Sequence, residues 1–283
     1  MYGTLDESKS SGKEYREHAE SASLETTSIK KLIEPRMKSS KSSLVRGLLV
    51  LESFTPETKG YSLAELSKSL GVPKSSLHRV VKELADMNYL RYEEQSKRYH
   101  LGTRVLSLGF SVLQGMELRE IARPYLERLS RECNKTVNLA IFNRDEMVYV
   151  ERIRVPGIRT YNISVGARMS PWNTAVGKVV LAHLPEEKLN EIVRKQRTNP
   201  EFNIKEFMNS LDDVRKDGFA LHQEFKRGFL AVAVPVFSDK GVACAINMIA
   251  EVEDVSVDGL QEEYAPKLMA VGWELSSALG YRK

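Results

Sequence analysis

The stretch Ser62–Leu84, SLAELSKSLGVPKSSLHRVVKEL, decides the fold of the N-terminal part of the chain. Ser62 is followed three residues later by Glu65, which is the capping-box pattern: each side chain satisfies a free backbone N–H of the other residue. Gly71 can adopt the left-handed conformation that ends a helix, and Pro73 suits the first turn of the next one. The stretch therefore predicts a short helix, a tight turn and a longer helix.

The longer helix has two chemically different sides. One side is apolar, and the other carries basic and hydroxyl side chains at intervals of three and four residues. Such a row is by itself more often a solvated helix face. Here two short strands, 89–92 and 98–101, follow it, which completes the order of a winged helix-turn-helix. We expect His78 and Arg79 to face DNA bases, with further contacts, mostly to phosphates, from Arg46, Lys74, Ser75, Ser76, Lys82, Lys97 and Arg98.

Length and composition fit two ordinary folded domains. The chain has 283 residues, a formal net charge of +4 and 42% hydrophobic residues. We expect residues 1–42 to be a disordered tail, because they hold few large apolar residues. Neither a secretory signal nor a long apolar segment is evident, which favours a cytoplasmic protein without membrane contact. Cys133 and Cys244 lie far apart, so neither a disulfide framework nor a metal site is indicated.

A core-facing helix begins near Ser43 and precedes the helix-turn-helix, with Leu44 and Leu48 in its apolar stripe. The domains that we expect are a winged helix-turn-helix over 43–102, a linker helix over 103–117 and an α/β domain over 118–283. In the last of these the pattern predicts strands at 137–143, 147–155, 160–166, 219–225, 230–237 and 241–252, and helices at 174–183, 185–196, 204–217 and 257–279.

Several segments, in order, resemble the IclR family of bacterial transcription regulators. They include LAELSKSLGVPKSSLHRVVKEL, YHLGTRVLSLG, IARPYLERL, VGARMSPWNTAVGKVVLAHLP and GFALHQEFKRGFLAVAVPVF. The resemblance implies an α+β fold in which a winged helix-turn-helix is followed by a GAF-like effector-binding domain. It also implies homodimers or homotetramers, and control of catabolic genes by small metabolites, commonly carboxylates. The family contains both repressors and activators.

The resemblance also implies an effector site in the second domain. In the family a helix start that maps onto Ala175 and Val176 helps to bind the effector. The other implied positions lie at or near Ile158, Tyr161, Met169, His222, Ala231, Asn247 and Ile249, and Glu224 matches an acidic position of the family. Tyr161 and Met169, each taken alone, would more often be ordinary core residues.

This chain departs from the family at the site. Members that bind very small oxo acids have Cys and two Ser where this chain has Ala231, Asn247 and Ile249, and Trp172 replaces the usual His. The departures favour a larger or less polar effector, such as an aromatic or sugar-derived acid. The segment TAVGK does not complete a nucleotide phosphate loop. Gly177 within it serves either an anion-binding helix start or close packing, and the two readings weigh equally.

Together these patterns predict a DNA-binding transcription regulator, a repressor of catabolic genes, whose partners are double-stranded operator DNA and a small-molecule effector. We expect no cofactor and no catalysis, because His183 and His222 lack recognisable partners. Two alternatives stay open: an enzyme with a fused DNA-binding domain, and a regulator whose second domain binds a protein. We expect the helix at 103–113 to transmit the effector signal.

Overall fold

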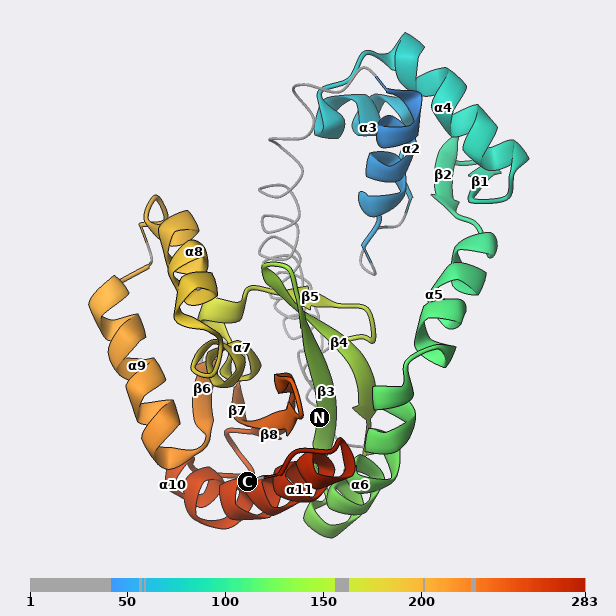
Figure 1. Cartoon of the computed structure of the whole chain (residues 1–283). Helices are drawn as coiled ribbons and strands as arrows, with labels where there is room; N and C mark the ends of the chain where they lie inside the picture. The colour runs from blue at the N-terminus through green and yellow to red at the C-terminus, as the bar shows by residue number, and fades with distance from the viewer. Residues whose placement is uncertain are drawn as a thin grey trace, which may run out of the picture. The chain divides into compact units, whose positions relative to one another are not determined.

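A computed structural model of the chain describes residues 42–55, 58, 60–155, 163–200, 202–224 and 228–282 (Figure 1). They form two compact units, divided between Gln114 and Gly115. The tail predicted over residues 1–41 lies outside the described residues. The exact domain limits given above stay predictions.

The first unit is a winged helix-turn-helix. Its elements are α2 (Ser43–Glu52), α3 (Leu63–Leu70), α4 (Lys74–Asp86), the antiparallel strands β1 (Leu90–Glu93) and β2 (Arg98–Leu101), and α5 (Arg104–Gln114). Both capping bonds at the start of α3 are present, and Gly71 ends the helix at φ 62°. The core holds Leu49, Val50, Leu66, Leu70, Leu77, Val81 and Leu90.

Two apolar patterns in this unit face outward rather than into the core. Leu44 and Leu48 of α2, predicted in the core-facing stripe, are 72% and 52% exposed. The reason is that the core of three short helices reaches only the side of α2 that carries Leu49 and Val50. The helix α5 likewise has no buried residue within its unit.

The second unit is built on a six-stranded antiparallel sheet in the order β5-β4-β3-β8-β7-β6. Its strands are β3 (Thr136–Asn143), β4 (Glu146–Ile153), β5 (Arg168–Met169), β6 (Ala220–Glu224), β7 (Phe229–Ser238) and β8 (Gly241–Glu251). The helical elements are α6 (Glu117–Cys133), the 3-10 turn η1 (Pro171–Asn173), α7 (Ala175–Leu181), α8 (Glu186–Gln196), α9 (Ile204–Asp217), α10 (Val257–Gly259), the π-helical turn η3 (Leu260–Tyr264) and α11 (Ala265–Ala278).

One predicted strand is wrong in its described part. The segment 160–166 was expected to be a strand, but residues 163–166 form a loop and a turn, and the short edge strand β5 follows them. Residues 160–162 lie outside the described part of the chain. Ile163 serves the core from a loop, since it is only 4% exposed, whereas Val165 is 39% exposed.

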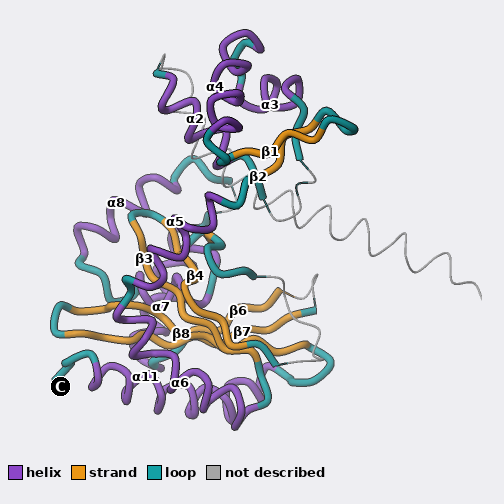
Figure 2. The backbone as a smooth tube through the Cα atoms, turned by 90° about the vertical axis from the view of Figure 1, so that its right-hand side faces the viewer, coloured by secondary structure: helices purple, strands orange, loops and turns teal. Residues whose placement is uncertain are grey.

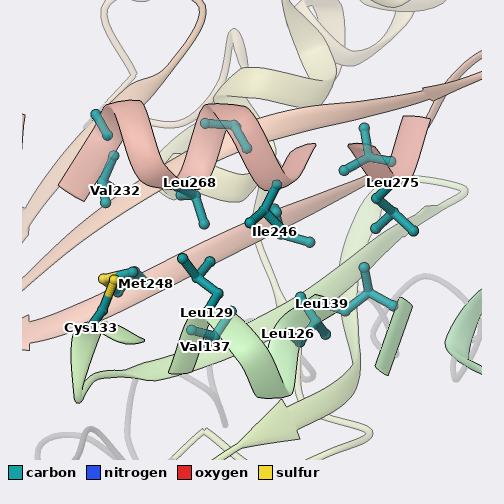
Figure 3. Close-up of a cluster of buried hydrophobic side chains, with 14 of the residues drawn as sticks. Leu126, Leu129, Cys133, Val137, Leu139, Val232, Ile246, Met248, Leu268 and Leu275 are labelled. Atoms are coloured by element: carbon teal, nitrogen blue, oxygen red, sulfur yellow. The ribbon is translucent and has the colours of Figure 1, made fainter. Parts of the chain in front are cut away.

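Helices cover both faces of this sheet, as Figure 2 shows. Because strand side chains alternate between faces, each central strand contributes to two separate cores. On one face α6 and α11 pack on the sheet, with Leu126, Leu129, Val137, Leu139, Val232, Ile246, Met248, Leu268 and Leu275 in the cluster drawn in Figure 3. On the other face lie α7, α8 and α9, and the alternate residues of β3, β7 and β8 point toward them. None of the helices in the described ranges is long and apolar enough to cross a membrane.

Candidate functional site

The helix α4 presents a basic surface. Its Leu77, Val80 and Val81 are buried, which turns the opposite side of the helix to solvent. Exposed on that side are Lys74, Ser75, His78, Arg79 and Lys82, whereas Ser76 is half-buried. The Arg79 guanidinium is held at one end of this surface, 3.5 Å from a Glu83 carboxylate oxygen and 3.4 Å from the Ser43 hydroxyl. The predicted row is therefore a continuous exposed surface of hydrogen-bond donors.

The other predicted DNA-contacting residues differ in how exposed they are and in whether they already bond within the protein. Lys97 is exposed at the tip of the β1–β2 hairpin, at a left-handed φ of 53°. Arg46 is half-buried on α2, and its Nε is a buried atom without a hydrogen-bond partner among the described residues. Arg98 donates to the Gly60 carbonyl at 2.6 Å and to the Glu65 carboxylate at 2.8 Å. Its guanidinium thus ties the wing to the start of α3.

Glu65 joins the helix cap to the wing. Its carboxylate accepts from the Ser62 amide at 2.8 Å as well as from Arg98. Hydrogen bonds from Ser62, first from the amide and then from the hydroxyl, lower the pKa of Glu65, and Arg98 adds to the effect. The local sequence could not predict that the capping residue Glu65 also binds the wing, because Arg98 lies 33 residues away.

A pocket lies on the α7 face of the sheet in the second unit. The empty space in it, including its mouth open to solvent, is about 430 Å³. Its lining residues are Tyr149, Ile163, Met169, Thr174, Ala175, Val176, His222, Phe229, Leu230, Ala231, Asn247 and Ile249.

Seven of the predicted effector positions meet in this pocket, namely Met169, Ala175, Val176, His222, Ala231, Asn247 and Ile249. Ile158 and Tyr161 lie outside the described residues, as does the side chain of Glu224. The sequence analysis did not single out the lining residues Tyr149, Ile163, Thr174, Phe229 and Leu230, whose apolar or small side chains resemble any core position.

Strand register explains why distant residues meet. His222 on β6 pairs with Ala231 on β7, which pairs with Ile249 on β8. Asn247 lies two residues before Ile249 and therefore points to the same face. The result is a floor of side chains from three adjacent strands, and residues at the start of α7 line the same pocket.

Gly177 lets α7 approach the preceding turn η1. A Cβ at this position would lie 2.0 Å from the Pro171 carbonyl oxygen and 2.3 Å from the Pro171 Cα. The Gly177 amide donates to the Thr174 hydroxyl at 3.1 Å, which caps the helix. Close packing is thus a sufficient reason for this glycine, and the anion-binding reading of the helix start stays a prediction.

The charges around the pocket are of one sign. No acidic residue is among the described residues that line it. Lys178 is half-buried on the otherwise apolar α7, burial lowers its pKa, and within the described ranges its amine forms no ion pair. Burial first, and then the Lys178 charge, lower the pKa of His222. Lys178 was not predicted as a residue of this site, because the segment TAVGK was tested only as a phosphate loop. A single charged residue within the apolar helix α7 is the feature of the sequence that could have pointed to it.

A buried amide pair adjoins the pocket. The Asn138 Nδ2 donates to the Asn247 Oδ1 at 3.0 Å, and the two side chains are 0% and 2% exposed. The two residues are register partners on β3 and β8. Asn138 was not predicted, although an asparagine inside the apolar run VNLAIFN is a recognisable signal.

The described residues show no catalytic constellation. No group of three His, Cys, Asp or Glu side chains in the described ranges could hold a metal ion. The His183 Nδ1 lies 2.8 Å from the Val179 carbonyl oxygen, and its ring packs edge-on against Phe237, as expected for a packing residue. Both cysteines are buried, and burial raises the pKa of each thiol.

Models of known protein families match both parts of the chain. Residues 43–94 match the model of the IclR helix-turn-helix domain, and residues 110–277 match that of the bacterial transcriptional regulator IclR C-terminal domain. The transcriptional regulator XynR of Escherichia coli is 29% identical over 84% of this chain and 97% of its own length. The Pca regulon regulatory protein of Pseudomonas putida is 28% identical over 84% of each chain.

A solved structure shows the same arrangement of elements. The IclR family transcriptional regulator from Brucella abortus is 26% identical, with a TM-score of 0.71 over 86% of this chain and 94% of its own. The helix-turn-helix domain implies DNA binding, and the named relatives are transcriptional regulators. Because the model of the IclR C-terminal domain alone matches residues 110–277, more than half of the chain, the chain belongs to the IclR family.

Proposed function

We propose that this protein regulates transcription by binding operator DNA through α4 and that a small organic acid in the pocket controls the binding. The observation that carries the proposal is the exposed basic row of α4 within a helix-turn-helix domain. A helix in the major groove needs donors toward base edges and cations toward phosphates, and α4 presents both. Acting on DNA, the protein would work in the cytoplasm, as a repressor of catabolic genes.

The DNA test compares two arginines. Operator sites are first selected from genomic fragments with the full chain, and affinity is then measured by fluorescence anisotropy. Arg79→Ala should weaken specific binding by about 1 to 3 kcal/mol, because a bidentate arginine–base contact is lost. Arg194→Ala removes an exposed arginine from α8 and is the matched control. Unchanged affinity and footprint with Arg79→Ala would refute the assignment of α4.

The pocket supports an organic acid as the effector. Its walls are largely apolar, its ionisable lining groups are His222 and Tyr149, and Lys178 lies beside it without an acidic partner in the described part of the chain. An apolar pocket with a few polar groups is typical of a metabolite site rather than a protein-docking surface. The lining therefore favours an aromatic or sugar-derived acid over a very small oxo acid.

Calorimetric titration with a panel of such acids tests this part of the proposal. Binding of glyoxylate or pyruvate in preference to every larger acid would contradict it. The effector should also change operator affinity, because a ligand acts only through different affinities for two arrangements of the protein. We place the transmission in α5. Saturating effector that leaves operator affinity, DNA geometry and polymerase recruitment unchanged would rule out this coupling.

Self-association is the remaining part of the proposal. Large apolar side chains of the first unit are exposed on α5, and such patches mark interaction sites. They are Leu106, Leu108, Phe110 and Val112, which are between 55% and 61% exposed. A homodimer or homotetramer would cover them, and sedimentation velocity of the full chain measures the state directly. A monomer at micromolar concentration would contradict this part.

A further inference from the structure

The strand β3, next to the pocket strand β8, carries buried polar groups that an apolar core does not need. Asn138 is completely buried and its Oδ1 has no hydrogen-bond partner among the described residues. Thr136, two residues earlier on the same face of β3, also has a buried hydroxyl without a partner. Buried polar groups cost free energy unless they are bonded, so their retention beside a pocket indicates recognition rather than packing.

In the hydrogen bond between Asn138 and Asn247, Asn138 is the donor and Asn247 is the acceptor. The Asn138 Nδ2 donates to the Asn247 Oδ1, so the carbonyl end of Asn247 is occupied. Asn247 lines the pocket, and within the described ranges its Nδ2 makes no hydrogen bond. With its oxygen turned toward Asn138, this carboxamide directs its amino group, which has two N–H donors, toward a ligand. The pocket therefore presents a donor, and not an acceptor, at β8.

The end of the pocket floor that is formed by β6 carries a positive charge rather than an amide. His222 lies on β6, two strands away from β8, and its neighbour Lys178 makes this end positive. From the strand spacing and the two-residue offset in register, the His222 and Asn247 positions are about 12 Å apart. With a hydrogen bond of about 2.9 Å at each end, one ligand reaches both groups if its polar atoms are about 6 Å apart. A ring with polar groups on opposite carbons has this span.

We propose that the pocket takes an organic acid that carries a hydrogen-bond acceptor at the end opposite to its carboxylate, and that Asn138 selects this acceptor by fixing the orientation of Asn247. The inference rests on the proposed effector site and adds its chemistry. The carboxylate lies toward Lys178 and His222, and the apolar body lies over Ala231 and Ile249. Asn138 is a positioning residue, since it acts on the ligand through Asn247.

The first test uses two acids of the same shape. In 4-hydroxybenzoate the group opposite to the carboxylate accepts a hydrogen bond, whereas in 4-aminobenzoate that group donates and accepts poorly. Calorimetry on the full chain should show tighter binding of 4-hydroxybenzoate, by about fivefold for one hydrogen bond. Asn138→Leu keeps the side-chain volume but frees Asn247 to turn, so the ratio of the two affinities should fall toward one.

Thr136→Val is the matched control, because it removes a buried polar group from the same strand face without touching the amide pair; the ratio should keep its wild-type value. Equal affinities in the wild-type protein, or an unchanged ratio in Asn138→Leu, would overturn the inference. In both outcomes the acids still bind, so the proposed function stands. Absence of binding by every acid of the panel would overturn both.

A second measurement needs no variant and therefore no assumption about folding. In the ¹⁵N-labelled full chain, one amino hydrogen of Asn138 is held in the buried pair, whereas the amino group of Asn247 faces the pocket. The side-chain N–H signals of Asn138 should exchange with solvent more slowly than those of Asn247, and addition of 4-hydroxybenzoate should shift those of Asn247. The reverse order of exchange would show the opposite direction of the pair and overturn the inference.

Discussion

Replacement of Gly177 by alanine should destabilise the second unit and deform its pocket. The added Cβ would lie 2.0 Å from the Pro171 carbonyl oxygen and 2.4 Å from its carbonyl carbon. Ordinary carbon–oxygen contacts are about 3.3 to 3.6 Å, so α7 and η1 would have to separate by about 1 Å. The obstacle is backbone and cannot turn away as a flexible side chain would. The overpacking should lower the free energy of unfolding by about 3 kcal/mol, and the better helix propensity of alanine should raise it by about 1 kcal/mol.

The net loss of about 2 kcal/mol corresponds to a Tm lower by about 4 to 8 °C for a domain of this size. Differential scanning calorimetry of the full chain measures it, and acid binding should weaken because Thr174 and Val176 line the pocket on the displaced segment. Gly109→Ala is the matched control. Gly109 lies inside α5 with no atom within 4 Å of an added Cβ, so this change should stabilise the chain by about 0.5 to 1 kcal/mol. A Gly177→Ala protein with wild-type Tm and acid affinity would refute the packing argument.

Three further predictions follow from other contacts. Glu65→Ala removes the capping box of α3 and the ion pair with Arg98 on the wing. It should lower the free energy of unfolding in urea by about 1 to 2 kcal/mol. The control Glu83→Ala removes only an exposed ion pair and should change this free energy by less than about 0.5 kcal/mol. Lys178→Met removes a half-buried cation that has no acidic partner among the described residues, so it should raise Tm and at the same time weaken acid binding. Unchanged acid binding, or a lower Tm together with weaker binding, would contradict the assignment of Lys178 to the ligand. Because the pKa of His222 lies below its usual 6.5 in the folded chain, the stability that it contributes is full above pH 6.5 and is lost as the pH falls below that value. Tm measured from pH 8 to pH 5 should therefore fall less in His222→Gln than in the wild-type protein, whereas an equal fall would refute the burial of a neutral imidazole.

The first unit could be predicted closely because its signals are local. The cap at Ser62 and Glu65 and the turn at Gly71 each depend on residues fewer than five positions apart. The direction of apolar side chains was less predictable. Leu44 and Leu48 have the helical spacing of core residues, yet they are exposed, because a three-helix core covers only part of α2.

The family resemblance predicted most of the pocket positions, but only the tertiary structure shows which polar groups meet there. The family pattern brought out Ala175, His222 and Asn247, and all of them line the pocket. Nothing local to β3 indicates that Asn138 meets Asn247, because the two are 109 residues apart and become neighbours only through the register of β3 and β8. Likewise, an isolated lysine in α7 gains meaning only when β6 brings His222 beside it.

The sequence by itself determined the order of the helices, the order of the strands other than the edge strand β5, and the basic row of α4, because caps, turns and side-chain periodicity act over a few neighbouring residues. Only the tertiary structure decided which polar groups are buried together, which apolar surfaces stay exposed and which face of the sheet carries the pocket. Those properties depend on strand register and on contacts between residues far apart in the chain, and a one-residue change of register would turn Asn138 and Asn247 away from the pocket.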